Sequence, residues 1–384
     1  MTVVLSYDDG YGDNKLYDGV KELLIPTYIT EWREEMEQEI NPNGDKRHPY
    51  DYITIELEDE FEVKLPGGKR QTVRQTVKYL VGKGAIEQDS NGTASLGENK
   101  HKDKEFKYLM MACLGLLVEN ESTFVDMLSM GLPVKAAEDP SRHELLKKMI
   151  VGKPLKFTLT LADGTVLPRT IHIEELMIKK QPFGSHADLF LDENGEFNLE
   201  NIEYADAYVG ICDIGARTFN WYTLEGLKPI SDLSNNDENG MFVAYKAINK
   251  NTIAKLTGYE LPDSELPMII NEVGKINGHD LTIPRAIAYD NHANRIAKQV
   301  EKIYINSWAK LKTLIFTGGG SELLHDSLVD LLDNRPYLFL DRFATARGLR
   351  KLALNELNSR KKAVAANKKA APKAAQEKGN EQTA

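Results

Sequence analysis

The sequence predicts an α/β protein made of two duplicated halves that face each other. Two short runs rich in β-branched residues, 3–7 and 208–212, are typical of buried strands, and each ends at a turn that begins with aspartate. The chain has 384 residues, more than one hydrophobic core usually supports. A strand and turn repeated in a chain of this length favours two domains over one.

Both turns have the composition of a phosphate-binding loop. Glycine lets the backbone bend sharply and brings its N–H groups close to phosphate oxygens, while an aspartate at a strand end can hold a hydrated divalent cation. The first turn contains Asp8, Gly10, Tyr11, Gly12, Asp13, Asn14 and Lys15, and the second contains Asp213, Gly215, Ala216 and Arg217. Two such turns facing each other could hold one nucleotide.

Composition excludes several classes of protein. The chain is 41% hydrophobic and 28% charged, as expected of a globular protein, and its two cysteines, Cys113 and Cys212, lie in apolar stretches. We therefore expect no disulfide framework or zinc site, and a reducing cytoplasm. No signal peptide and no long apolar span is evident, which disfavours export and membrane insertion. The net charge of −10 argues against direct sequence-specific DNA binding.

The first half contains a polar, turn-rich stretch that looks like an inserted lobe, residues 41–107. Within it, residues 52–57 and 60–65 alternate apolar and polar side chains, which predicts two half-exposed antiparallel strands. Residues 89–104 are expected to form a mobile loop. The nearly continuous apolar run 108–118 is too long for a typical strand and predicts a buried helix.

The remainder of the first half predicts a hairpin. Residues 131–134 (Gly-Leu-Pro-Val) open a new unit, and the strand 157–161 is followed by Asp163-Gly164, a strong signal for a tight turn. A further strand is expected near 171–178.

The second half repeats this plan. Residues 240–256 and 291–311 have helical spacing, and plain core helices are the default interpretation. A third strand, 313–317, leads into Gly318, Gly319, Gly320 and Ser321, and then into a helix over 322–332. Three glycines leave no side chain between backbone and ligand, and Ser321 is a natural N-cap. The turn is therefore either a site for a flat base or phosphate, or a simple connector.

The C-terminal tail has the opposite charge from the rest of the chain. From Arg360 onward it carries seven basic and two acidic residues, and no large apolar residue follows Val364. Its Ala- and Lys-rich composition predicts disorder beyond that point. The tail either adds solubility or docks on an acidic surface or on DNA phosphates.

Taken in order, these motifs resemble the superfamily of actin, sugar kinases and heat-shock-seventy ATPases. The similarity is greatest to the ParM-like plasmid-segregating actins of bacteria, through the first turn, residues 131–134, Lys180 to Gly184, the triple-glycine turn and the stretch 342–349. It covers roughly residues 1–356. The resemblance implies an actin-like α/β fold: two duplicated RNase H-like domains, each with a smaller inserted lobe, around a nucleotide cleft.

The resemblance also implies a domain layout. A first domain is expected over 1–205, with its insert at about 41–107, and a second over 206–340. A C-terminal helix over 341–359 would return to the first domain, and 360–384 would form the basic tail.

The resemblance further implies roles for individual residues. Asp8 and Asp213 would face a hydrated Mg²⁺, Lys15 would neutralise phosphate charge, and Gln181 would orient the attacking water. Contacts to ATP or GTP would come from the first turn, Gly215 to Arg217 and Gly318 to Ser321. The second turn departs from the family pattern at Ala216, Arg217 and Asn220, and Arg217 would either pair with phosphate or point into solvent.

The activity implied is an ATPase or GTPase coupled to filament assembly. The protein would associate with itself as a polar filament and move plasmid DNA through a DNA-binding adaptor at a centromere-like site. A small-molecule kinase of the same fold, a chaperone-like ATPase and a non-catalytic actin-like scaffold are the alternatives. A kinase would need an acceptor pocket, and a chaperone would need a further folded domain.

Overall fold

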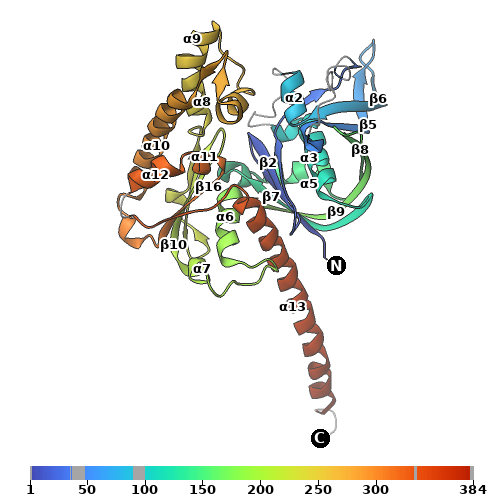
Figure 1. Ribbon diagram of the computed structural model, residues 1–384. Coiled ribbons are helices and arrows are strands. Elements are labelled where there is room, and N and C mark those ends of the chain that lie inside the picture. The colour runs from blue at the N-terminus through green and yellow to red at the C-terminus, as the bar shows by residue number, and fades with distance from the viewer. Residues whose placement is uncertain (1, 35, 37–47, 90–99, 333–334, 381–384) are drawn as a thin grey trace.

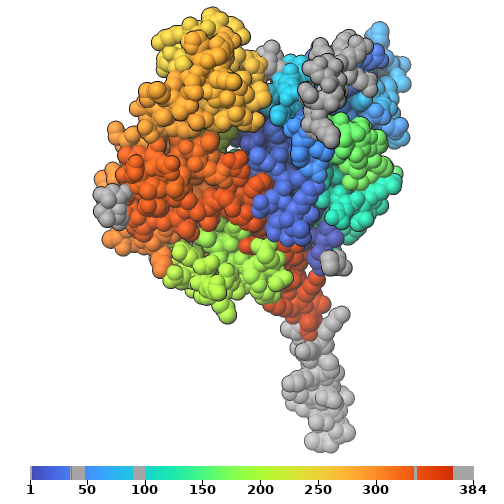
Figure 2. Space-filling model, viewed as in Figure 1, coloured from blue at the N-terminus to red at the C-terminus, as the bar shows by residue number. Residues whose placement is uncertain are grey.

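The protein forms two lobes, each built on one large β-sheet (Figure 1). The structure, a computed structural model, describes residues 2–34, 36, 48–89, 100–332 and 335–380, with side chains through residue 365. In Figure 2 the blue-to-green lobe and the yellow-to-orange lobe lie side by side, with the segment around α6 and α7 beneath them. This arrangement agrees with the predicted actin-like α/β fold.

The first lobe contains a nine-stranded sheet in the order β3-β2-β1-β7-β9-β8-β5-β6-β4. Its strands are β1 (Val4–Asp9), β2 (Asp13–Tyr17), β3 (Glu22–Pro26), β4 (Ile29–Glu31), β5 (Ile53–Lys64), β6 (Arg70–Val81), β7 (Ser122–Leu132), β8 (Leu155–Leu161) and β9 (Val166–Lys180). Its helices are α2 (Lys83–Gln88), α3 (Lys104–Leu117), α4 (Val134–Ala137), α5 (Pro140–Ile150), α6 (Gln181–Phe190) and α7 (Glu203–Asp206), with helical turns at Pro49–Asp51 and Lys100–Lys102.

The second lobe contains a six-stranded sheet in the order β12-β11-β10-β16-β17, with β13 also paired to β11. Its strands are β10 (Tyr208–Ile214), β11 (Phe219–Glu225), β12 (Lys228–Pro229), β13 (Asn235–Asp237), β16 (Thr313–Thr317) and β17 (Tyr337–Phe339), with a separate pair β14 (Lys275–Ile276) and β15 (His279–Asp280). Its helices are α8 (Phe242–Ile248), α9 (Ala254–Thr257), α10 (Thr282–Tyr304), α11 (Gly319–Leu323), α12 (His325–Leu332) and α13 (Ala344–Asn380), with helical turns at Ser231–Leu233, Asn249–Ile253, Met268–Val273 and Trp308–Lys310.

The two sheets share a five-strand pattern. In both, the central strand makes an antiparallel hairpin with the next strand and a parallel pair with a later one: β1 with β2 and β7, and β10 with β11 and β16. The registers also correspond, because Asp8 lies opposite Lys15 and Gly131, and Asp213 lies opposite Asn220 and Thr317. The duplication predicted from the two turns is therefore present in strand order, direction and register.

The core of each lobe is formed by the predicted buried helix and its sheet. In the first lobe α3 is buried along nearly its whole length, as the apolar run 108–118 predicts. In the second, α10 buries Ile296, Val300 and Tyr304. The predicted hairpin around Asp163-Gly164 joins β8 and β9, whose antiparallel pairing begins at Thr160 and Val166. Within the described residues, none of the helices is both long and apolar enough to cross a membrane.

Three predictions within the insert were wrong or lie outside the described residues. Residues 52–57 and 60–65 belong to one strand, β5, because Glu58-Asp59 between them carries no turn signal; the chain reverses instead at Gly67-Gly68, where both glycines have positive φ. The two segments therefore do not pair with each other, and β5 pairs instead with β6 and β8. The expected loop 89–104 falls partly outside the described residues, yet its end is buried at Lys100 and His101.

The helix α13 ties the two lobes together and extends from the underside of the molecule (Figure 1). It packs on α6 and on β1 and β7. The two helices are equivalent in the duplication, because α6 follows β9 and α13 follows β17, the strand in the same place of the second sheet. Arg347 bridges Glu22, Asp188 and Asp341, and Lys351 Nζ lies 2.8 Å from Asp188 Oδ1. The helix continues to Asn380, where the composition had predicted disorder. Alanine and lysine both have high helix propensity.

Two buried histidines predict acid sensitivity of the fold. Burial lowers the pKa of His186 and of His292 from 6.5 to about 4. The unfolded chain therefore binds more protons than the folded chain between these values, and the free energy of unfolding falls as the pH drops from about 6.5 to about 4. We expect His292→Gln to reduce the difference between unfolding free energies at pH 7 and pH 5, measured by urea denaturation, by about 2 kcal/mol. The exposed His325→Gln is the control, and an equal effect of both variants would contradict the assignment.

Candidate functional site

A cavity of about 370 Å³ lies between the lobes, where the central strands of both sheets end. It is lined by the first turn, by the second turn and by the start of α11. The predicted site residues that line it are Asp8, Gly10, Tyr11, Gly12, Asp13, Lys15, Gln181, Asp213, Gly215, Ala216, Gly319 and Gly320. Residues from four separate parts of the chain are thus brought to one space.

Three polar side chains meet at the end of β1. Gln181 Nε2, at the first position of α6, donates to Asp8 Oδ1 at 2.8 Å, and Lys15 Nζ lies 3.3 Å from Asp8 Oδ2. Gly131, opposite Asp8 in the sheet, leaves the space for this contact, since an added Cβ there would lie 3.3 Å from both Asp8 Oδ1 and Gln181 Cγ. The proximity of Asp8, Lys15 and Gln181 is the arrangement that the resemblance implied.

Asp213 ends the equivalent strand of the second lobe and is held by Asn220. Asn220 Nδ2 donates to Asp213 Oδ2 at 3.1 Å. Burial, followed by the negative charge of Asp8, raises the pKa of Asp213 to about 7, although Lys15 and Asn220 act in the opposite direction. The cleft therefore brings the carboxylates of Asp8 and Asp213 close enough to interact. Without a cation beside it, Asp213 loses its proton less readily than an ordinary aspartate.

Lys15 lies within the field of three carboxylates. Burial alone would lower the pKa of Lys15, but Asp8, Asp213 and Asp13 together raise it above its usual range. The ammonium group thus stays charged inside the cleft and offsets part of the repulsion between Asp8 and Asp213. It also places a positive charge beside glycine-rich backbone, which suits a phosphate group.

The two turns can meet because glycine occupies the closest positions. A Cβ added at Gly12 would lie 2.7 Å from Ala216 Cβ, nearer than real Cβ contacts come. Gly318 has φ +86°, and a Cβ there would lie 2.4 Å from Asp213 Oδ1. Glycine is therefore required at both positions, at the first by the contact between turns and at the second also by the left-handed backbone.

The structure differs from the sequence-based expectation at four site residues. Ser321 is not an N-cap, because Gly318 occupies that position. Ser321 lies within α11, and its hydroxyl donates to the carbonyl of Thr317 at the end of β16. Gly319 and Gly320 line the cavity, whereas Gly318 and Ser321 are not among its lining residues. Their contribution is to the shape of the turn.

The other two are Asn14 and Arg217. Asn14 is buried within β2, where it accepts a hydrogen bond from Tyr7. The guanidinium of Arg217 lies 2.6 Å from Glu238 Oε1 and 5.5 Å from the centre of the Tyr11 ring, and Arg217 is not among the residues that line the cavity. Of the two orientations considered for Arg217, the structure thus has the one directed away from the cavity.

Another part of the cavity lining is apolar and aromatic, and local sequence patterns indicated little of it. Phe242, Tyr245 and Met268 line it, together with Asn271. Asn271 Nδ2 donates to the Tyr245 hydroxyl at 2.9 Å, and its carbonyl oxygen accepts from Tyr289. The only sequence signal was the helical spacing of Phe242 and Tyr245, which aromatic residues of an ordinary core share.

A cross-lobe hydrogen bond lies beside this part of the lining. The Tyr28 hydroxyl, from the first lobe, is hydrogen-bonded to Ser264, from the second. Burial, followed by the charge of Asp263, raises the pKa of Tyr28 to about 12, so the hydroxyl stays protonated. Both residues line the cavity, and Tyr28 directly follows Thr27, whose N–H donates to the carbonyl of Gly12 in the first turn.

The donor set fits a magnesium ion that keeps several waters. Asp8 and Asp213 are buried carboxylates of the two turns, and Asn220 Oδ1 is buried with no hydrogen-bond partner among the described residues. No group of three or more His, Cys, Asp or Glu side chains converges as a metal site in the part of the chain that the structure describes. Mg²⁺ is commonly held by one or two carboxylates plus substrate phosphates, which matches this arrangement.

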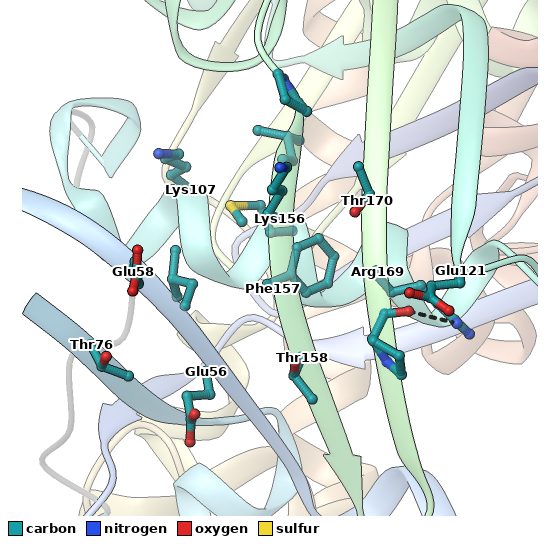
Figure 3. A pocket seen from close by; sticks show the side chains of 15 residues that line it. Glu56, Glu58, Thr76, Lys107, Glu121, Lys156, Phe157, Thr158, Arg169 and Thr170 are labelled. Carbon is teal, nitrogen blue, oxygen red and sulfur yellow. Dashed lines mark hydrogen bonds between the residues drawn. The ribbon is translucent and has the colours of Figure 1, made fainter.

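A second hollow, of about 640 Å³, lies in the first lobe beside β5, β8 and α3 (Figure 3). Its labelled charged side chains have both signs: Glu56, Glu58, Glu121, Lys107, Lys156 and Arg169. Arg169 Nε donates to the carbonyl of Gly115 at 2.9 Å, so this cation supports the backbone of α3. The hollow lacks the glycine turns and paired carboxylates of the cleft, which remains the candidate site.

Comparisons with known proteins agree with this geometry. A family model for the N-terminal domain of actin-like proteins matches residues 6–184, and one for the C-terminal domain of archaeal MreB-like actin homologues matches residues 211–330. No curated protein matches the chain. Together the two family models cover all three glycine turns and leave residues 1–5, 185–210 and 331–384 unmatched.

Solved structures share the fold over nearly the whole chain. The apo ParM protein of pSK41 is 20% identical with a TM-score of 0.65, covering 94% of this chain and 98% of its own. A 15-stranded ParM filament from Clostridium botulinum is 20% identical with a TM-score of 0.67, covering 93% and 99%. An archaeal actin homologue in complex with ADP is 20% identical with a TM-score of 0.65, covering 92% and 99%.

The family matches on both lobes and the duplicated strand-and-turn register together lead to one conclusion: the chain is an actin-like protein, and its fold is shared with ParM and archaeal actin homologue structures.

Proposed function

We propose that this protein is a cytoplasmic, nucleotide-dependent filament-forming ATPase or GTPase that moves plasmid DNA through a DNA-binding adaptor. The observation that carries the proposal is the meeting of Asp8, Asp213, Lys15 and Gln181 in one cleft between glycine turns. Neither lobe supplies this set alone. A ligand that bridges the cleft would therefore couple nucleotide binding to the relative position of the lobes.

The phosphate chain would lie at the glycine-rich end. Gly10, Gly12 and Gly215 line this end without side chains, so backbone N–H groups can approach phosphate oxygens. The ammonium of Lys15 supplies positive charge between Asp8 and Asp213. A bound Mg²⁺ would neutralise phosphate charge that these two carboxylates would otherwise repel.

The base would lie at the apolar end. Phe242, Tyr245 and Met268 offer flat or polarizable surfaces for stacking, and Asn271 offers an amide already oriented by two tyrosine hydroxyls. Amides pair with either adenine or guanine edges, so both ATP and GTP suit this wall. Charge at one end and aromatic surface at the other define the polarity of the bound nucleotide.

Hydrolysis would depend on Gln181. Phosphoryl transfer to water requires a positioned water and charge stabilisation more than a strong base. Gln181 is buried, and its amide is fixed by Asp8 at 2.8 Å and by the carbonyl of Asp9 at 3.4 Å. An amide held on the carboxylate that faces the phosphates can orient a water without taking up its proton, which suits slow hydrolysis after assembly.

Assembly and DNA transport extend the proposal beyond the cleft. One of the similar structures is a ParM filament, and the shared fold supports a polar filament for this chain. Head-to-tail contacts are heterologous and non-closing, so a single pair of surfaces suffices for an open polymer. The net charge of −10 disfavours direct contact with DNA and favours an adaptor between filament and plasmid.

Light scattering after addition of Mg-ATP or Mg-GTP tests assembly. We expect scattering to rise above a critical protein concentration, filaments in negative-stain images, and phosphate release that follows the rise. Mg-ADP is the control for nucleotide binding without hydrolysis. The proposal is wrong if no polymer forms at high protein concentration with either triphosphate across a range of salt.

Gln181→Ala tests hydrolysis. We expect phosphate release to fall by about 10²–10³-fold, the usual effect of removing one transition-state hydrogen-bonding group, with nucleotide affinity changed less than about tenfold. Single-turnover phosphate release and equilibrium binding separate the two quantities. Gln71→Ala, on the exposed hairpin strand β6, is the matched control and should leave both unchanged. An affinity loss as large as the rate loss would assign Gln181 to binding instead.

Asp213→Asn tests the second carboxylate. The substitution keeps size and shape but removes the negative charge, so we expect Mg²⁺-dependent hydrolysis to fall by at least about 100-fold. The nucleotide-free protein should be no less stable to urea, because the change removes repulsion from Asp8. Undiminished phosphate release would remove Asp213 from the mechanism.

A further inference from the structure

A buried ion cluster lies directly behind the first turn and has no part in the roles described above. Lys100 Nζ lies 2.6 Å from Asp9 Oδ1, and His101 Nε2 lies 2.6 Å from Asp9 Oδ2. The three side chains are at most 3% exposed. Burying charged groups costs free energy unless they are paired, and even a paired buried cluster adds little net stability. A role other than stability is therefore expected for this cluster.

The ammonium of Lys100 also holds backbone of the turn. It donates to the carbonyl of Gly10 at 3.2 Å and to that of Asp9 at 3.5 Å. Thr27 Oγ1 donates to the same Gly10 carbonyl at 2.9 Å. Neither Lys100 nor Thr27 lines the cavity, whereas Gly10, Tyr11 and Gly12 do. The Gly10 carbonyl is therefore drawn toward the protein interior.

The direction of this carbonyl determines the direction of the next amide. In a trans peptide the C=O and the following N–H point in opposite directions, and the described residues contain no cis peptide bond. With the Gly10 carbonyl held by Lys100 and Thr27, the Tyr11 N–H points to the opposite, cavity-facing side. Lys100 Nζ also lies 4.5 Å from the centre of the Tyr11 ring, which restricts the side chain of the same residue.

The cluster anchors this arrangement to a rigid element. The His101 ring packs edge-on against Phe106 of α3, with ring centres 4.7 Å apart, and Phe106 is fully buried. Burial alone would raise the pKa of Asp9, but Lys100 and His101 outweigh it and hold that pKa below its usual range. Asp9 therefore stays ionised, and the turn is tied to the helix at the centre of the first lobe.

From this geometry we infer that Lys100 is a positioning residue for nucleotide binding: through Asp9 and the Gly10 carbonyl it holds the first turn in its phosphate-binding conformation. The inference rests on the proposed nucleotide site. It adds to that site a residue that lies 91 positions from Asp9 in the sequence. Buried ion pairs contribute little net stability but can specify one conformation among several. Lys100 acts here on the conformation of the backbone and makes no contact with the nucleotide.

The experiment measures binding of fluorescent Mg-ATP and Mg-GTP, phosphate release and urea stability in four variants. We expect Lys100→Met to raise the nucleotide Kd by about 10- to 100-fold, as misplacement of a binding group does, and Lys100→Arg to recover part of the affinity. Lys351→Met is the matched control, because Lys351 is another buried lysine, paired with Asp188 and remote from the cavity. It should lower stability and leave Kd unchanged.

The fourth variant, Asp9→Asn with Lys100→Met, removes both charges of the Lys100–Asp9 pair, so neither is left buried without the other. It reports on affinity even where Lys100→Met alone fails to fold. Its Kd should be raised as well, because the Gly10 carbonyl has lost the ammonium. An unchanged Kd in folded Lys100→Met or in the folded double variant, or an equal rise of Kd in Lys351→Met, would overturn the inference. Absence of nucleotide binding by the wild-type chain would instead overturn the proposed function itself.

Discussion

The structure depends on the close approach of two turns, each at the end of the central strand of its sheet. Gly12 and Ala216 would clash if the former carried a Cβ, and Gly131 and Gly318 leave room beside Asp8 and Asp213. Since no side chain separates the turns, the two carboxylates enter one small volume. The shape of the cavity and the interaction between its two carboxylates both follow from this contact.

The charges in the cleft are incompletely balanced. Three carboxylates raise the pKa of Lys15. Burial and the negative charge of Asp8 raise the pKa of Asp213 to about 7, so Asp213 ionises only near neutral pH. The two halves differ at equivalent positions, since Lys15 lies opposite Asp8 in the sheet and Asn220 lies opposite Asp213. One turn thus carries its own counter-charge and the other does not. In the nucleotide site proposed above, this asymmetry between the halves would give the phosphate chain one orientation.

Local sequence patterns predicted most of the fold. The strands β1, β10 and β16, the buried helix α3 and the β8–β9 hairpin each carry a signal in consecutive residues, and the structure contains them all. The failures have specific causes. Residues 52–65 form a single strand because alternation continues through a stretch without a turn signal, and Ser321 lies inside a helix because Gly318 takes the left-handed position that ends the strand.

The sequence by itself determined the duplication and the identity of Asp8 and Asp213 as candidate site residues, because strand periodicity and glycine turns are local properties. The roles of Lys15 and Gln181 came from the resemblance of the ordered motifs to a known family. Only the tertiary structure decided that these residues meet, that Arg217 pairs with Glu238, and that Phe242 and Tyr245 line the same cavity. The same holds for the burial of Lys100 against Asp9. Contacts between distant segments depend on sheet register and helix packing, which no short pattern of residues records.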